Sequence, residues 1–76
     1  MGKLPALKSK VVLRALHAGG FDIMHQTGSH VRLHHPEKPH VRVTVPFHTR
    51  FDLPPSVIQS ILRQAELSRD EFLELL

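Results

Sequence analysis

The sequence predicts an α+β domain: an antiparallel sheet of three strands, two helices on one face of the sheet, and a short helix at the end of the chain. Two observations lead to this prediction. Apolar side chains recur at helical spacing in residues 10–18 and 53–65. Between these segments, residues 21–26, 30–35 and 40–45 alternate apolar and polar side chains, as strands with one solvated face do. The expected order is helix, strand, strand, strand, helix, with residues 1–76 forming a single domain.

The first helix is expected over Lys10–Ala18, after an irregular leader. Ser9 is the predicted N-cap, because a serine hydroxyl can accept a hydrogen bond from the first turn. Gly19-Gly20 ends the helix, as glycine commonly does. The apolar face holds Val12, Leu13 and Leu16, and the basic outer face holds Lys8, Lys10, Arg14 and His17.

The strands are expected to turn one aliphatic face to the helices. In the first strand this face holds Phe21 and Ile23, together with His25. Pro36 and Pro39 bound a predicted turn, because neither proline fits a central strand. The aliphatic face of the other two strands holds Val31, Leu33, Val41, Val43 and Val45, and their polar face holds His30, Arg32, His34, His40, Arg42 and Thr44.

The pairing of the second and third strands follows from this alternation. Residues directly opposite each other on an antiparallel pair share a face. His30 is therefore expected to pair with Thr44 or Pro46, and not with Val45. Either pairing brings the end of the third strand, and the loop that carries His48, close to His30.

The second helix is expected to be capped by Asp52 or Leu53, with Pro54 and Pro55 in its first turn, where proline is tolerated. Its apolar stripe holds Val57, Ile58, Ile61, Leu62 and Ala65. The segment Ser68-Arg69-Asp70-Glu71 matches a capping box, which predicts the short last helix.

Positive charge is concentrated in the body of the chain. Residues 1–63 contain nine Lys/Arg against three Asp/Glu, whereas residues 64–76 contain one Arg against four Asp/Glu. A basic body favours partners that carry phosphates, with ordinary solubilising charge as the alternative. In a chain of 76 residues, a site for a large polymer or a protein is more in keeping with the small core than a deep metabolite pocket.

The composition also indicates the cellular compartment in which the protein is expected. The absence of cysteine excludes a disulfide framework and a thiolate metal site. No apolar run is long enough to span a bilayer, and the start carries no signal-peptide pattern. We therefore expect a cytoplasmic location and no membrane partner.

The segment Thr27-Gly28-Ser29-His30 is predicted to form a tight turn between the first two strands. Gly28 supplies the backbone freedom such a turn needs, and Ser29 can bond to a neighbouring backbone group. His30 is then the first residue of the second strand, on its polar face. Because histidine exchanges protons near neutral pH, His30 is a candidate for acid–base chemistry, with an inert surface histidine as the alternative.

Residues spread along the whole chain resemble the HicA-type toxins, small mRNA interferases of bacterial toxin–antitoxin pairs. Gly28-Ser29-His30 is the most diagnostic element of this resemblance. The others are Lys3-Leu4-Pro5, Gly20-Phe21, Val45-Pro46 with His48, Ser60-Ile61-Leu62-Arg63-Gln64-Ala65, Leu67-Ser68 and Glu71-Phe72-Leu73. Thr49, Pro54-Pro55-Ser56 and Glu66 depart from the family pattern; Glu66 replaces a glycine, which matters if the position is left-handed.

The resemblance implies a fold like that of double-stranded-RNA-binding domains, cleavage of RNA, and a HicB-type antitoxin that covers the site. The catalytic histidine of the family falls on His30. The chemistry needs no metal or other cofactor if a base takes the 2′-hydroxyl proton and an acid protonates the leaving 5′-oxygen, and histidine serves in either role. His48 is the candidate second proton carrier, with a phosphate-contacting loop histidine as the alternative.

The candidate RNA-binding residues lie on the first helix, at the turn, on the polar sheet face and in the following loop. They are Lys8, Lys10, Arg14, Gly28, Ser29, Arg32, Arg42, Thr44 and Arg50. No functional metal site is predicted, because His34 and His40 are the one expected close pair and two ligands make only a weak site. Two other functions stay open: a non-catalytic double-stranded-RNA binder, and an interaction module that docks a protein on its polar sheet face or its acidic, leucine-rich end.

Overall fold

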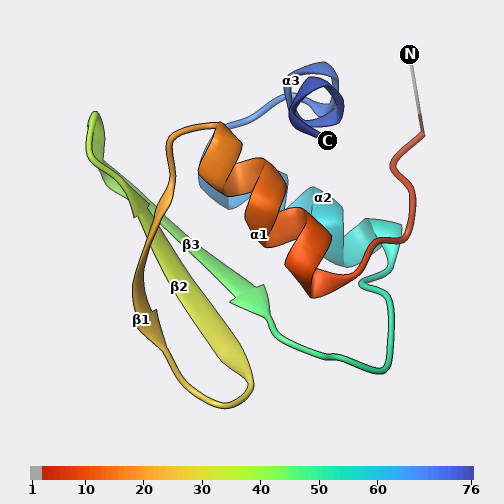
Figure 1. Cartoon of the computed structure of the whole chain (residues 1–76). Coiled ribbons are helices and arrows are strands. Elements are labelled where there is room, and N and C mark those ends of the chain that lie inside the picture. The colour runs from red at the N-terminus through yellow and green to blue at the C-terminus, as the bar shows by residue number, and fades with distance from the viewer. Residues whose placement is uncertain (1–2) are drawn as a thin grey trace.

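The computed structural model describes residues 3–76, which form three helices and one antiparallel sheet. The elements are α1 (Ser9–Ala18), β1 (Asp22–Gln26), β2 (His30–His35), β3 (Lys38–Pro46), α2 (Pro55–Ala65) and α3 (Arg69–Leu75), with the strands in the order β1-β2-β3. Helices α1 and α2 lie on one face of the sheet, and α3 packs against α1 (Figure 1). The predicted fold class and order are confirmed.

The core lies between the sheet and the helices. Every aliphatic position predicted for β2 and β3 is buried, as is most of the stripe predicted for α2. The buried side chains include Val12, Leu16, Phe21, Val31, Leu33, Val41, Val43, Val45, Ile58, Ile61 and Leu62. Phe72 of α3 is also fully buried. The acidic end of the chain therefore packs into the core and is not a free segment for docking a partner.

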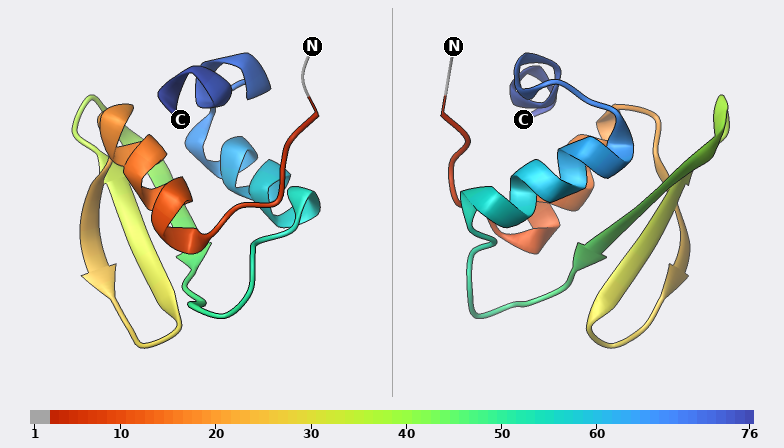
Figure 2. Two further views of the ribbon diagram at one scale, coloured as in Figure 1. Left: turned by 45° about the vertical axis from the view of Figure 1, so that its right-hand side comes forward. Right: turned by 180° about the vertical axis from the view of Figure 1, so that it is seen from behind.

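Strand β1 is one of the two edge strands, and the helices do not cover it (Figure 2). Phe21 is buried just before β1 begins, but Ile23 is 54% exposed. The prediction that Ile23 faces the core is therefore wrong. Ile23 pairs with Leu33 and lies on the helix side of the sheet, but the helices pack over the other two strands.

A β-bulge at Met24 moves His25 to the other face of the sheet. The pairing runs from Ile23 opposite Leu33 to His25 opposite Arg32, so Met24 is an extra residue in β1. An extra residue in one strand reverses the alternation of the residues that follow it. His25 therefore lies on the polar face beside Arg32, whereas strict alternation predicts it on the face of Ile23.

Ser9 joins two parts of the fold that are far apart in sequence. It is the first residue of α1, after Lys8 at the N-cap, and it makes no side-chain cap, which corrects the prediction. Instead, its buried hydroxyl donates to the carbonyl of Pro46 at 2.8 Å and accepts the N–H of His48 at 3.1 Å. The end of β3 is thus fixed to the start of α1.

The loop between β3 and α2 is also tied to the leader. Leu7 and Leu53 exchange two backbone hydrogen bonds of 3.1 and 2.7 Å. Asp52 pairs with the Lys8 ammonium at 3.1 Å and does not cap α2, which starts at Pro55 after Pro54 at the N-cap. The capping predicted for Asp52 or Leu53 is wrong, because the leader engages both residues.

The hairpin between β2 and β3 is tighter than predicted. Strand β3 begins at Lys38, so Pro39 lies inside a strand, which an edge strand tolerates. Because His30 pairs with Pro46, the same register places His34 opposite Arg42, and the pairing becomes irregular only after His34. The predicted close pair of His34 with His40 is therefore wrong.

Glu66 ends α2 in the left-handed conformation, with φ 57° and ψ 40°. This is the conformation in which the glycine that Glu66 replaces would be favoured. The Glu66 carboxylate lies 3.2 Å from Nε2 of His40 on β3, a contact that glycine could not make. The departure from the family pattern therefore adds a contact between α2 and the sheet.

The capping box predicted for α3 is present. Ser68 N–H donates to Oε1 of Glu71 at 2.8 Å, and Glu71 N–H donates to the Ser68 hydroxyl at 3.1 Å. The backbone of Ser68, and then its side chain, hold the pKa of Glu71 below its ordinary value of 4.5.

This capping box predicts a measurable dependence of stability on pH. Because the pKa of Glu71 is lower in the folded state, its stabilising effect is complete above about pH 4.5 and is lost as the pH falls through the lower folded value. We expect Glu71→Gln, which keeps an oxygen acceptor for Ser68 N–H, to lose less stability in acid than the wild type does. Urea titrations at pH 7 and pH 3 measure this, with Glu74→Gln as the control; equal losses in all three proteins would contradict it.

Candidate functional site

His30 begins β2 at a corner that several backbone contacts hold in place. Thr27 N–H donates to the His30 carbonyl at 2.9 Å, and His30 N–H donates to Thr27 Oγ1 at 3.2 Å. His30 pairs with Pro46, one of the two pairings that alternation predicts. Phe47 N–H then donates to the Ser29 carbonyl at 2.8 Å. The His30 side chain is left exposed on the polar face, on a backbone fixed from two strands.

The Ser29 hydroxyl orients the His30 ring. Its Oγ lies 3.0 Å from Nδ1 of His30, where the sequence predicted a bond to the backbone. In the tautomer that carries its hydrogen on Nδ1, the ring donates to Ser29 and Nε2 keeps its lone pair. A free lone pair on a ring fixed in this way is what a general base requires.

Gly28 is not needed for the shape of the turn. Among the described glycines, Gly20 with φ 98° has a positive φ and Gly28 does not. A Cβ atom at Gly28 would have no neighbour within 4 Å. The prediction that Gly28 is needed for backbone freedom is therefore wrong. Because Gly28 has no side chain, the space beside Ser29 and His30 is open, and a ligand can approach the backbone closely there.

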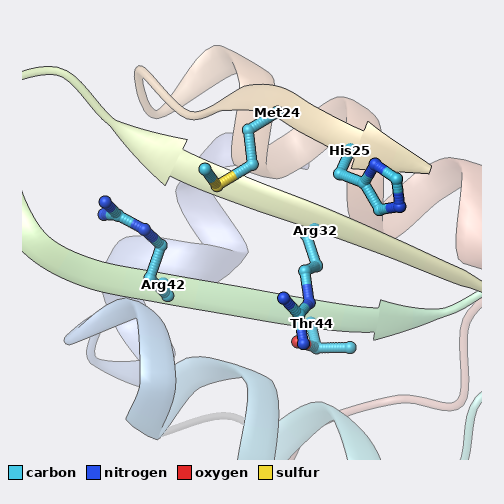
Figure 3. Close-up of a pocket in the computed structure, with 5 residues that line it drawn as sticks. All are labelled: Met24, His25, Arg32, Arg42 and Thr44. Atoms are coloured by element: carbon cyan, nitrogen blue, oxygen red, sulfur yellow. The ribbon is translucent and has the colours of Figure 1, made fainter.

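Two adjoining hollows lie on the polar face of the sheet. The one that contains His30 has a volume of about 500 Å³ and is lined by His25, Thr27, His30, Arg32 and Thr44. The other has a volume of about 310 Å³ and is lined by Met24, His25, Arg32, Arg42 and Thr44 (Figure 3). Because they share three residues, the two form one shallow surface across all three strands.

The two arginines of this surface are held differently. The Arg32 side chain leaves β2 and lies over Thr44 of β3, between the two hollows (Figure 3). Arg42 points away from Arg32, and its Nη1 donates to the carbonyls of Pro39 and Val41 at 2.8 and 2.9 Å. The Arg42 guanidinium keeps further N–H donors for a ligand, since the group has five.

The end of β3 lies beside His30, as predicted, but the His48 side chain lines hollows that do not include His30. His48 lines a cavity of about 120 Å³ with Lys8, Lys10 and Thr49. A neighbouring cavity of about 220 Å³ includes His48 and Arg50, together with the loop residues around them. The structure therefore brings the candidate residues together in two groups, one around His30 and one around His48. Arg14 is exposed a turn further along α1 than Lys10.

Sequence reasoning missed three residues at these surfaces. His25 was missed because alternation cannot reveal a bulge. Gln64 was missed because its role depends on docking of α2: its Oε1 accepts the N–H of Thr44 at 2.9 Å and so occupies the outer edge of β3. Phe51, 69% exposed beside Arg50, offers a ring on which an unpaired base can stack. Its exposure depends on the conformation of the loop, which no periodic pattern predicts.

His35 has a structural role at the other end of the sheet. Glu37 N–H donates to its Nδ1 at 3.1 Å, so Nε2 carries the hydrogen and donates to the Gly19 carbonyl at 3.2 Å. Its ring also meets Phe21 edge-on, with the centroids 4.9 Å apart. These contacts join the hairpin to the end of α1.

Within residues 3–76, no group of three or more histidine or acidic side chains is placed to hold a metal ion. None of the helices in this part of the chain has the length and apolarity needed to cross a membrane.

Fold and site together define a small α+β protein of helix–strand–strand–strand–helix order, with a histidine- and arginine-bearing sheet face turned to solvent. The family described as HicA toxin of bacterial toxin-antitoxin matches residues 9–67 of the 76, from the first residue of α1 to just beyond α2. The chain therefore belongs to the HicA toxin family, whose members are the toxins of toxin–antitoxin pairs. No curated protein matches the chain.

Proposed function

We propose that this toxin is a metal-independent endoribonuclease that cleaves mRNA, with His30 as its catalytic residue. The observation that carries the proposal is the placement of His30: its ring is exposed, oriented by Ser29, and shares a hollow with Arg32. Membership of a toxin family supports an activity that harms the cell, and the resemblance to HicA-type toxins supports RNA as its target.

The proposed reaction uses the 2′-hydroxyl of the RNA as its own nucleophile. Nε2 of His30 takes the proton of this hydroxyl, and the 2′-oxygen forms a bond to phosphorus. The bond from phosphorus to the 5′-oxygen breaks, and an acid protonates that oxygen. The products are a 2′,3′-cyclic phosphate and a 5′-hydroxyl, and DNA is not a substrate because it lacks the nucleophile.

The direct test incubates purified protein with labelled RNA, and with DNA of the same sequence, in excess EDTA. We expect cleavage of the RNA with cyclic phosphate ends, and intact DNA. A non-catalytic double-stranded-RNA binder of the same topology would bind the RNA and leave it intact. Loss of cleavage on chelation would contradict the metal-independent mechanism.

RNA binding to the polar face is expected to depend on Arg32 and Arg42. Each guanidinium can hold a phosphate, and each lost phosphate contact reduces the salt dependence of binding by about one unit of slope. We therefore expect Arg32→Ala/Arg42→Ala to bind RNA more weakly, with a slope of log Kd against log salt that is lower by about two units.

The matched control is Arg63→Ala/Arg69→Ala, which removes the same charge from the helices. Binding curves from 50 to 300 mM salt separate a local contact from a general charge effect. If the two double variants lose the same slope, the polar sheet face is not the RNA site.

A HicB-type antitoxin is proposed to neutralise the toxin by covering His30. The corner is exposed, and Arg32 beside it suits a partner surface that carries Asp or Glu. We expect amide hydrogen exchange at residues 27–32 to slow in the complex while exchange in α3 does not change, and we expect RNA to compete with the antitoxin. Protection confined to α2 or α3, with cleavage still blocked, would show that inhibition does not act by covering this residue.

A further inference from the structure

The bulge at Met24 gives the hollow of His30 a second histidine. Without it, His25 would share the face of Ile23 and lie on the other side of the sheet. With it, His25 lies on the polar face directly opposite Arg32, as Figure 3 shows. His25 is exposed, and none of the hydrogen bonds or ion pairs found within the described chain occupies its ring.

The strand pairing sets the distance between the two histidines. His25 is opposite Arg32, and His30 lies two residues before Arg32 on the same face of β2. Diagonal neighbours of this kind lie about 7–8 Å apart, within reach of long side chains. Both rings line the same hollow of about 500 Å³, whereas the hollows lined by His48 do not include His30.

The other residues of the hollow do not suit proton transfer. The Arg32 guanidinium stays protonated in proteins, so it can hold a phosphate oxygen but cannot exchange a proton. The hydroxyls of Thr27 and Thr44 are weak acids. Of the five residues that line this hollow, His25 and His30 are therefore the two with an imidazole, the side-chain type that most often serves as general acid or base.

We infer that His25 is the second catalytic residue, which protonates the leaving 5′-oxygen while His30 takes the proton of the 2′-hydroxyl. This inference rests on the proposed ribonuclease function and replaces His48 in the acid role. One proton leaves the RNA at the 2′-oxygen and one returns at the 5′-oxygen, so no co-reactant is needed. Arg32 lies next to His25 across the strands and is placed to hold the phosphate between the two rings.

The test compares two short RNAs that contain one mapped cleavage site. In the second RNA, sulfur replaces the 5′-oxygen at the scissile bond, and a thiolate leaves without help from an acid. We expect His25→Ala to cleave the ordinary RNA about 10²–10⁴-fold more slowly than the wild type, and the sulfur RNA at close to the wild-type rate. His30→Ala should be slow on both, because the attacking hydroxyl is the same.

Two further variants separate proton transfer from charge and from surface effects. His25→Arg carries the positive charge of a protonated imidazole but cannot give up a proton, so it should bind RNA as the wild type does and cleave the ordinary RNA as slowly as His25→Ala. His34→Ala removes another histidine from the same face of β2, opposite Arg42 and outside this hollow, and should cleave both RNAs at the wild-type rate.

The inference is overturned if His25→Ala is equally slow on both RNAs, if it is as fast as the wild type on the ordinary RNA, or if His25→Arg restores cleavage. If His25→Ala cleaves the ordinary RNA as fast as the wild type, His48 becomes the candidate acid. His48→Ala should then be slow on the ordinary RNA and close to the wild-type rate on the sulfur RNA. If the wild type cleaves neither RNA, the proposed ribonuclease function itself is wrong.

Discussion

His30→Ala is expected to fold, to bind RNA and to cleave it about 10²–10⁴-fold more slowly than the wild type. The fold is expected to survive because the side chain is exposed and its backbone contacts do not depend on the ring. The free energy of unfolding should change by less than about 0.5–1 kcal/mol, as surface substitutions usually change it. Binding should persist, because Arg32 and Arg42 remain.

Three measurements on the same preparation test this expectation: urea unfolding, RNA affinity and cleavage rate. Ser29→Ala is the informative companion, because it keeps the imidazole and removes its orienting hydroxyl. It should slow cleavage less than His30→Ala does. Induced expression should show the same order, with growth arrest and RNA loss for the wild type and neither for His30→Ala. If purified His30→Ala degrades RNA at the same rate as the wild type, His30 is not the catalytic residue.

Phe72→Ala is expected to cost about 3–5 kcal/mol of stability, the usual result of removing a buried phenylalanine ring. Phe72 is fully buried, although it lies in the acidic segment beyond the residues that match the family. The free energy of unfolding of a native protein is about 5–15 kcal/mol in total, and a chain of 76 residues has only a small core to supply it. We therefore expect this variant to be partly unfolded at 37 °C.

Leu76→Ala is the matched control, since its side chain is in the same segment but 50% exposed. It should change the free energy of unfolding by less than about 0.5 kcal/mol. Urea titrations of both variants measure the difference. If Phe72→Ala and Leu76→Ala cost the same, the end of the chain does not contribute to the core, and its use as a docking segment for a protein partner becomes the better hypothesis.

Local sequence patterns determined the sheet and the core. Val31, Leu33 and Val43 were predictable because strand residues alternate between faces, and a face with aliphatic side chains alone has to be buried. The same parity limited the partner of His30 to two residues, of which Pro46 is the one observed. The capping box of α3 was predictable because both of its hydrogen bonds join residues within one turn.

The tertiary structure decided which histidine shares the hollow of His30, where Ser9 directs its hydroxyl, and which apolar residues stay exposed. A bulge depends on how two strands pair, so residues 22–26 alone give no sign that His25 reaches the polar face. Ser9 looks like a cap within its own segment, but its hydroxyl partners come from the far end of β3. Ile23 is exposed because the helices pack over other strands. In each case the deciding contact joins residues distant in sequence, and the periodicity of a single segment carries no information about such contacts.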